Sequence, residues 1–177
     1  MASRKARRPK QAATLPPAPA PAAAAPPETR RVLFVCTGNI CRSLMAEQLL
    51  RHIAAQRGLK FEAASAGVAA EPSYTVPDAA KRLLAAEGVP PFEHKARLAT
   101  REVLRWADVI LVMTAAHQDH VVEQFPEFAA RTRLFREAAG FGEQDVEDPM
   151  GRSDETFARV LGVIRESLDA LVRTNFK

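Results

Sequence analysis

Two residues of one short segment, Cys36 and Arg42, have side chains that could together transfer a phosphoryl group. A cysteine thiolate is a strong nucleophile, and the planar guanidinium of arginine can bind two phosphoryl oxygens at once. The apolar run at 32–35 predicts a buried strand before this segment, and helical spacing of apolar residues begins at Leu44. Backbone N–H groups between a strand and a helix can converge on an anion. We therefore predict a phosphate cradle that favours the thiolate form of Cys36.

The whole segment, CTGNICRS at 36–43, is called the cysteine loop below. Gly38 and Asn39 are residue types that tolerate the unusual backbone angles a cradle needs. The hydroxyl of Ser43 could donate a hydrogen bond to the Cys36 sulfur and help it leave. Besides the nucleophile and the arginine, we predict substrate-binding roles for Thr37, Gly38, Asn39, Ile40, Cys41 and Ser43.

The spacing Cys-x5-Arg-Ser, between a strand and a helix, resembles the signature of cysteine-dependent phosphatases. The fuller string CTGNICRS resembles the low-molecular-weight protein tyrosine phosphatase family in particular, and the resemblance extends over roughly residues 31–173. It implies a metal-independent phosphatase that needs no cofactor and works through a phosphocysteine intermediate. We expect its partner to be a phosphorylated protein substrate, and the protein itself to be a cytoplasmic monomer.

Such a reaction also needs a general acid that later becomes a general base. Three carboxylates, Asp145, Glu147 and Asp148, lie close together before the last predicted helix, and their chemistry alone does not rank them. The family that the sequence resembles carries its acid in an Asp-Pro pair near the C-terminus. Asp148 is the only aspartate followed by proline, so the resemblance implies that Asp148 is the acid.

The resemblance also implies supporting residues around the cysteine loop. Ser65 and His94 stand where the family places residues that hydrogen-bond the loop asparagine, here Asn39. The remaining histidines, at 52, 117 and 120, are predicted to lie on the surface or on a helix face. Two of them are three residues apart, which would permit a metal site, but no third ligand is apparent and we predict no metal.

Both cysteines of the chain, Cys36 and Cys41, lie in the cysteine loop. In a reducing cytosol neither is expected to form a structural disulfide. Cys41 could be a small packing residue, or it could form a reversible disulfide that protects Cys36 from over-oxidation. The resemblance favours the second interpretation.

The choice of substrate depends on two departures from the family pattern. Met150 stands where tyrosine phosphatases usually have an aromatic residue, so it could form an apolar wall without ring stacking. The Ser-Ala-Gly-Val and Asp-Pro-x-Gly strings also resemble the bacterial protein arginine phosphatase branch, which has threonine at the position of Ile40. An apolar Ile40 suits an aryl phosphate. We predict phosphotyrosine as substrate, with phosphoarginine as the alternative.

Two other functions fit the sequence less well. Arsenate reductases of similar fold relay oxidation through further cysteines, which this chain lacks. A phospho-ligand binding module that has lost turnover would have no use for a general acid.

The order of predicted elements indicates the fold. Strands are predicted near 61–65, 109–113 and 132–135, and helices at 77–87, 116–124 and 154–172. This alternation predicts a single doubly wound α/β domain at 31–177, with about four parallel strands and helices on both faces. Ligands bind beyond the carboxyl ends of such strands, where the cysteine loop is expected.

Residues 1–30 differ in composition from the rest of the chain. They are rich in Ala, Pro and basic residues, and they predict a disordered tail. The tail carries six basic residues and one acidic residue, a charge of +5, whereas the remainder has 19 basic and 20 acidic residues, a charge of −1. The tail could contact an acidic partner, or nothing specific. No apolar stretch is long enough for a membrane span.

Overall fold

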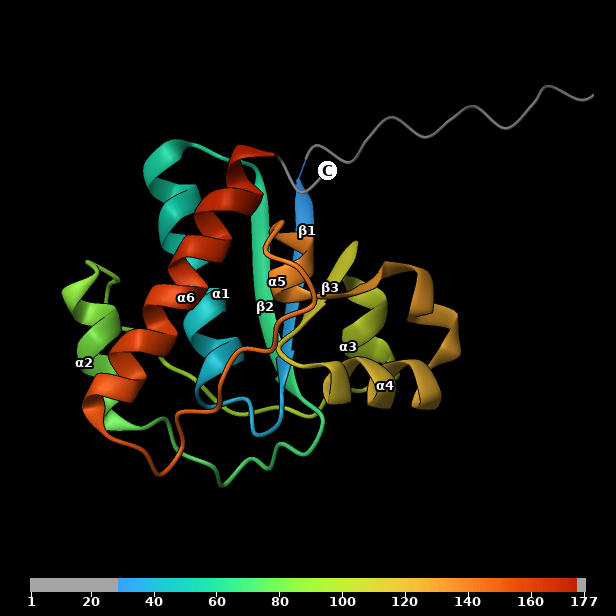
Figure 1. Ribbon diagram of the computed structural model, residues 1–177, viewed down its shortest axis with the longest axis horizontal. Helices are drawn as coiled ribbons and strands as arrows, with labels where there is room; N and C mark the ends of the chain where they lie inside the picture. Colours follow the sequence, from blue (N-terminus) through green and yellow to red (C-terminus); the bar gives the residue numbers. More distant parts are fainter. Residues whose placement is uncertain (1–28, 175–177) are drawn as a thin grey trace, which may run out of the picture.

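The computed structural model describes residues 29–174, which form a four-stranded parallel sheet flanked by helices (Figure 1). The strands lie in the order β2-β1-β3-β4. Their bounds are Arg30–Cys36 for β1, Phe61–Gly67 for β2, Val109–Val112 for β3 and Thr132–Leu134 for β4. The predicted α/β domain with a four-stranded parallel sheet is therefore confirmed.

Helices cover both faces of this sheet. One face is covered by α1 (Arg42–Arg57) and α6 (Asp154–Arg173), with α2 (Asp78–Ala86) packed against these two helices. The other face is covered by α3 (Arg101–Trp106) and α4 (Ala115–Gln124) (Figure 1). A 3₁₀ helix at Pro126–Arg131 precedes β4, and the short α5 (Phe135–Ala138) follows it. No helix within residues 29–174 is long and apolar enough to cross a membrane.

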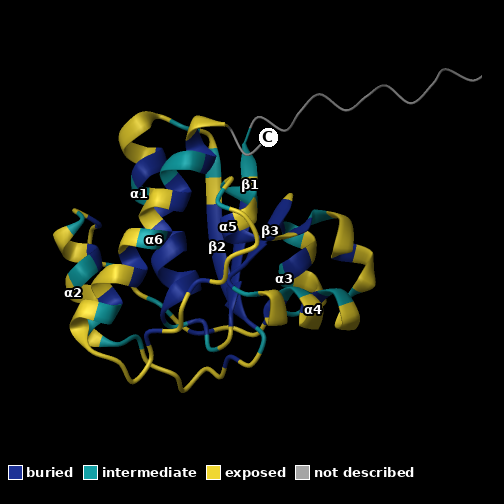
Figure 2. Ribbon diagram, in the orientation of Figure 1, coloured by how far each residue is buried: buried dark blue, intermediate teal, exposed yellow. Residues whose placement is uncertain are grey.

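Strand β1 lies at the centre of the fold, and its side chains alternate between two hydrophobic cores. Val32 and Phe34 pack on the side of α1 and α6, whereas Leu33 and Val35 pack on the side of α3 and α4. Figure 2 shows the strands as the most buried part of the molecule. Cys36 is the last residue of β1, so the two cores hold the segment that carries it.

Three short elements were missing from the predicted order, namely α3, the 3₁₀ helix and α5. Each has six residues or fewer, which is too short for an apolar period to appear. The predicted strand at 132–135 ends one residue earlier, because Phe135 begins α5.

The predicted tail at 1–30 lies almost entirely outside the described residues. Thr29 and Arg30 are the exceptions, and Arg30 is the first residue of β1.

Candidate active site

The cysteine loop connects β1 to α1 at the carboxyl end of the sheet. Helix α1 begins without a side-chain cap and without an acidic residue in its first turn. In contrast, α3, α4 and α6 are each capped by the hydroxyl of a preceding residue. The backbone N–H groups at the start of α1 therefore face the loop without competition from a capping side chain, which suits an anion.

Asn39 gives the cysteine loop its shape. With a φ of 58°, it is the only residue other than glycine with a positive φ within residues 29–174. Gly38 does not share this conformation, contrary to the sequence-based interpretation. A Cβ atom at Gly38 would lie 3.4 Å from a ring carbon of Tyr74, an ordinary van der Waals distance, so this ring packs beside the loop at Gly38.

The left-handed backbone of Asn39 is fixed by hydrogen bonds to every polar group of its side chain. Its Nδ2 donates to Ser65 Oγ at 2.8 Å and to Ser43 Oγ at 3.0 Å. Its Oδ1 accepts from the backbone N–H of Arg97 at 3.0 Å. Its backbone carbonyl lies 2.7 Å from His94 Nε2, and since a carbonyl only accepts, that nitrogen donates.

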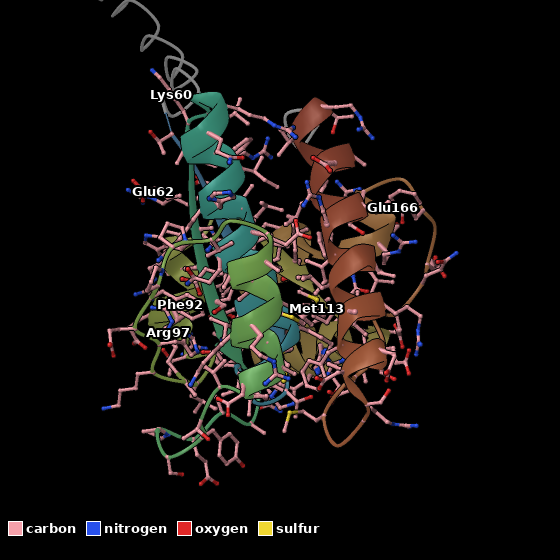
Figure 3. All side chains as sticks on the ribbon, turned by 90° about the vertical axis from the view of Figure 1, so that its left-hand side faces the viewer. Lys60, Glu62, Phe92, Arg97, Met113 and Glu166 are labelled. Atoms are coloured by element: carbon pink, nitrogen blue, oxygen red, sulfur yellow. The ribbon has the colours of Figure 1, made fainter. Side chains whose placement is uncertain are left out.

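Two residues outside the predicted set, Arg97 and Glu47, complete this network. Arg97, labelled in Figure 3, also donates from Nε to the carbonyl of Ser65 at 2.7 Å. The buried Glu47 of α1 accepts a hydrogen bond from the Ser65 hydroxyl and pairs with Arg51 at 2.9 Å. The support for Asn39 thus reaches from β2 into α1.

Cys36 is buried, and its sulfur lies 2.9 Å from Ser43 Oγ. Because Ser43 Oγ already accepts a hydrogen bond from Asn39, its own proton is free to be donated to the sulfur. This is the hydrogen bond that would stabilise a thiolate.

Arg42 and Asp148 lie in direct contact. Arg42 Nη2 is 2.8 Å from Asp148 Oδ2, and Nη1 donates to the carbonyl of Val146 at 3.1 Å. The arginine side chain is buried, whereas that of Asp148 is 48% exposed. Arg42 Nε has no hydrogen-bond partner among the described residues, although a buried donor is costly to leave unpaired. The N–H group at Arg42 Nε is therefore available to donate a hydrogen bond to an anion.

The aspartate loop, residues 139–153, holds Asp148 in this place. Its Val146 N–H donates to the carbonyl of Met113 at 2.8 Å, and Met113 is the buried residue after β3 labelled in Figure 3. Asp145 accepts from the N–H of Ala115, and Glu147 pairs with Arg159. Of the three carboxylates that the sequence left open, only Asp148 lines the pocket.

A cavity of about 290 Å³ opens above the cysteine loop. Tyr74 lies on its wall and is partly exposed. The sequence-based analysis missed this residue, although it is the only tyrosine of the chain and lies in a loop at the carboxyl end of β2. The cavity is lined by Cys36, Thr37, Gly38, Ile40, Cys41, Arg42, Tyr74, Asp148 and Met150.

Cys41 forms part of the cavity floor as a neutral thiol. Burial, followed by the negative charges of Cys36 and Asp148, raises the pKa of Cys41 to about 12. Its sulfur lies 3.0 Å from the sulfur of Met150. Both cysteines are free thiols.

His117 lies on helix α4, one of the two positions that the sequence predicted for it, but its side chain is only 6% exposed. Its Nε2 lies 2.8 Å from Thr37 Oγ1 and its Nδ1 lies 2.9 Å from Thr114 Oγ1. Burial, followed by the charge of Arg42, lowers the pKa of His117 to about 4, so the ring is neutral near pH 7. His120 is exposed, as predicted. Within residues 29–174 no group of three or more His, Cys, Asp or Glu side chains could hold a metal.

A thiol in a phosphate cradle, with a buried arginine and a carboxylate on the pocket wall, is the arrangement of cysteine-dependent phosphatases. Residues 31–177 match the model of one family within that class, low molecular weight phosphotyrosine protein phosphatase. The match covers most of the chain, and the protein belongs to this family.

Curated relatives and solved structures are similar over most of the chain. The chain is 34% identical to a protein-arginine-phosphatase of Bacillus subtilis, over 80% of this chain and 91% of the relative. It is 36% identical to the low molecular weight protein-tyrosine-phosphatase Wzb of Escherichia coli, over 77% of this chain and 88% of the relative. The crystal structure of a low molecular weight protein tyrosine phosphatase from T. tengcongensis has a TM-score of 0.79 at 36% identity, covering 82% of this chain and 99% of that one.

Proposed function

We propose that this phosphatase hydrolyses phosphotyrosine in proteins through a phosphocysteine on Cys36. The observation that carries this proposal is the meeting of Cys36, Arg42 and Asp148 in one cavity whose other walls are largely apolar. We further propose that it acts as a monomer in the cytoplasm, where free thiols such as its two cysteines persist.

In the first step the Cys36 thiolate attacks phosphorus. An S–P bond forms as the P–O bond to the phenol breaks, and Asp148 gives its proton to the departing oxygen. The loop N–H groups and Arg42 hold the three equatorial oxygens as charge spreads over them. Arg42 is paired with the Asp148 carboxylate, so the phosphoryl group of the substrate replaces that carboxylate on the guanidinium. Asp148, released from the cation, takes up from solvent the proton that it gives to the departing oxygen.

In the second step the deprotonated Asp148 takes a proton from water, whose oxygen attacks phosphorus. The S–P bond breaks, inorganic phosphate forms and the thiolate is restored. The Ser43 hydroxyl at 2.9 Å stabilises the departing sulfur. Asp148 is half-exposed, which lets water reach it.

The cavity walls support an aryl group on the phosphate. Tyr74 and Met150 lie near the mouth of the cavity, and both are partly exposed. A phenol ring would bury apolar surface between them, with an aromatic contact to Tyr74 and a sulfur contact to Met150. Ile40 adds a third apolar side chain to the same cavity.

Phosphoarginine is the second candidate substrate. It is favoured by the similarity to two relatives named protein-arginine-phosphatase, each 34% identical over 80% of this chain. It is disfavoured by Ile40, which offers no hydroxyl to a phosphoguanidinium.

A comparison of two phosphopeptides tests this choice. Turnover of a phosphotyrosine peptide and of a phosphoarginine peptide of the same sequence is measured in EDTA, with the parent protein and with Ile40→Thr. We expect the parent to prefer phosphotyrosine and the variant to shift toward phosphoarginine. A parent that prefers phosphoarginine would show that the pocket walls do not choose the substrate, and turnover of neither would favour a binding module.

The catalytic roles make a separate prediction. Cys36→Ser is expected to abolish turnover while the fold is preserved. Asp148→Ala is expected to slow phosphotyrosine hydrolysis by about 10²-fold or more, and rapid acid quenching should trap the phosphocysteine. Glu147→Gln is the matched control, because Glu147 pairs with Arg159 outside the cavity, and it should stay close to the parent rate. Equal losses in the two carboxylate variants would contradict the assignment of Asp148.

A further inference from the structure

The start of α4 contacts both segments that carry the reacting groups. On one side, His117 bonds Thr37 of the cysteine loop at 2.8 Å. On the other side, the N–H of Ala115 donates to Asp145 of the aspartate loop at 2.8 Å. Thr114 caps the helix by accepting the N–H of His117, so the imidazole belongs to a fixed first turn.

Thr37 is held by hydrogen bonds from the segments that follow β2 and β3, the two strands beside β1 in the sheet. Its carbonyl accepts the N–H of Ala69 at 3.0 Å, and the carbonyl of Cys36 accepts the N–H of Val68 at 2.9 Å, so the segment after β2 fixes the backbone. From the β3 side, His117 reaches the Thr37 hydroxyl. The residue that follows the nucleophile is thus clamped between the carboxyl ends of two strands.

We propose that His117 is a positioning residue for Cys36, acting through the side chain of Thr37 and independently of the general acid. This inference rests on the proposed function in taking Cys36 as the nucleophile.

The two threonine hydroxyls match what a neutral imidazole can offer. A neutral ring has one N–H donor and one acceptor nitrogen, and a hydroxyl can serve either of them. The chain Thr114–His117–Thr37 is therefore satisfied in both tautomers, and each one fixes the rotamer of Thr37. The low pKa of His117, due to burial and to Arg42, keeps the ring in this neutral form.

The alternative is that His117 only fills space at the start of α4. Its Nε2 contact spans 80 positions of sequence and reaches the residue next to the nucleophile, whereas its Nδ1 contact stays within the helix cap. These two contacts can be removed separately, because the amide of glutamine can reach the position of Nε2 and that of asparagine only the position of Nδ1. The pair His117→Gln and His117→Asn therefore separates positioning from packing.

Three readouts distinguish the roles. The first two are kcat/KM for a phosphotyrosine peptide and for an aryl phosphate whose phenol is acidic enough to leave without a proton. The third is the rate at which iodoacetate alkylates Cys36, located by peptide mass spectrometry; Cys41 stays protonated because its pKa is about 12. His120→Ala is the control, since His120 is exposed on the same helix.

We expect His117→Asn to lower kcat/KM about tenfold on both substrates and to change the rate of Cys36 alkylation. His117→Gln should stay within about threefold of the parent, because it keeps the bond to Thr37. Thr37→Val should lose as much as His117→Asn, and the double variant should lose no more than either one. Thermal unfolding of each variant shows whether the fold is kept.

Other outcomes would overturn the proposal. Equal losses in His117→Asn and His117→Gln would mean packing alone, and additive losses in the double variant would mean that the bond to Thr37 does not matter. A loss confined to the phosphotyrosine peptide would place the effect on the general acid. If the parent hydrolyses neither compound, the proposed function fails, whereas the alkylation rates still test whether His117 positions Cys36.

Discussion

His117 is the only histidine of residues 29–174 whose side chain is buried, and its position has an energetic consequence. The imidazole has no carboxylate among its hydrogen-bond partners, which are both hydroxyls. Charging the ring would put a cation into a site that already contains the guanidinium of Arg42. The folded state therefore favours the neutral ring, and acid that protonates the ring should destabilise the fold.

The first prediction concerns stability in acid. The pKa of His117 falls from 6.5 to about 4 on folding, so between these values the unfolded chain binds the extra proton. The neutral His117 ring therefore contributes its full stabilisation above pH 6.5, and this contribution is lost as the pH falls toward 4. The total loss is on the order of 3 kcal/mol. Urea unfolding at pH 7 and at pH 4.5 should show this loss. It should be much smaller in His117→Gln, which cannot be protonated, and an equal loss in both proteins would contradict the prediction.

Spacing in the sequence predicted only those residues of the site that share one loop, whereas Ser65, His94 and Asp148 followed from the family resemblance. Cys36, Asn39, Arg42 and Ser43 share one loop, so spacing alone placed them together. The burial of His117 and its bond to Thr37 were not predicted, because Thr37 is 80 positions away and neither residue type requires the other. Tyr74 was missed for the same reason, since nothing local indicates that its ring would lie on Gly38.

At the scale of elements, the shape of the cysteine loop depends on how closely the end of β2 approaches it. Gly67 is the last residue of β2, and a Cβ atom there would lie 2.9 Å from the backbone nitrogen of Asn39. It would also press on the carbonyl of Thr37. The Ser-Ala-Gly string therefore ends in glycine because the two backbones touch.

The second prediction is that Gly67→Ala both destabilises the protein and slows it. Overpacking at this contact should lower the free energy of unfolding by about 1–3 kcal/mol. Because the displaced atoms belong to the cysteine loop, kcat/KM should fall by about tenfold. Urea unfolding and turnover of an aryl phosphate measure the two effects.

A second glycine provides the matched control. Gly162 lies in the exposed face of α6, with nothing within 4 Å of the position of a Cβ atom. Gly162→Ala should therefore stabilise the protein by about 0.5–1 kcal/mol through helix propensity and leave turnover unchanged. If Gly67→Ala left both stability and kcat/KM as high as Gly162→Ala does, the close approach of β2 would not matter for the cysteine loop.

The long elements were predictable for a physical reason that the short ones lack. Helix α6 extends over 20 residues, so its apolar face repeats often enough to be recognised, and Ser153 marks its start. Helices α3 and α5 are too short to show a repeat, and they form because their neighbours in space complete the packing. The parallel direction of the strands followed from their alternation with helices, whereas their order in the sheet, β2-β1-β3-β4, did not.

At the scale of the whole molecule, the net positive charge and the candidate active site lie in different parts of the chain. The net charge of +4 comes from residues 1–30, which carry +5, while residues 31–177 carry −1. Every hydrogen bond of the site described above joins residues between Cys36 and Arg159. The family match likewise begins at residue 31.

The third prediction follows from this separation. A protein that begins at residue 29 keeps all of β1 and every contact of the cavity. Its kcat/KM for a small aryl phosphate whose phenol carries no charged substituent should equal that of the full chain within about twofold, because charges beyond a Debye length of about 10 Å are screened at 0.1 M salt. The isoelectric point, about 9.4 in the full chain, should fall to near neutral because residues 29–177 contain 20 basic and 20 acidic residues. A tenfold loss of turnover at 0.1 M salt would instead mean that residues 1–28 contribute directly to the site, and restoring the loss by adding that peptide in trans would prove it.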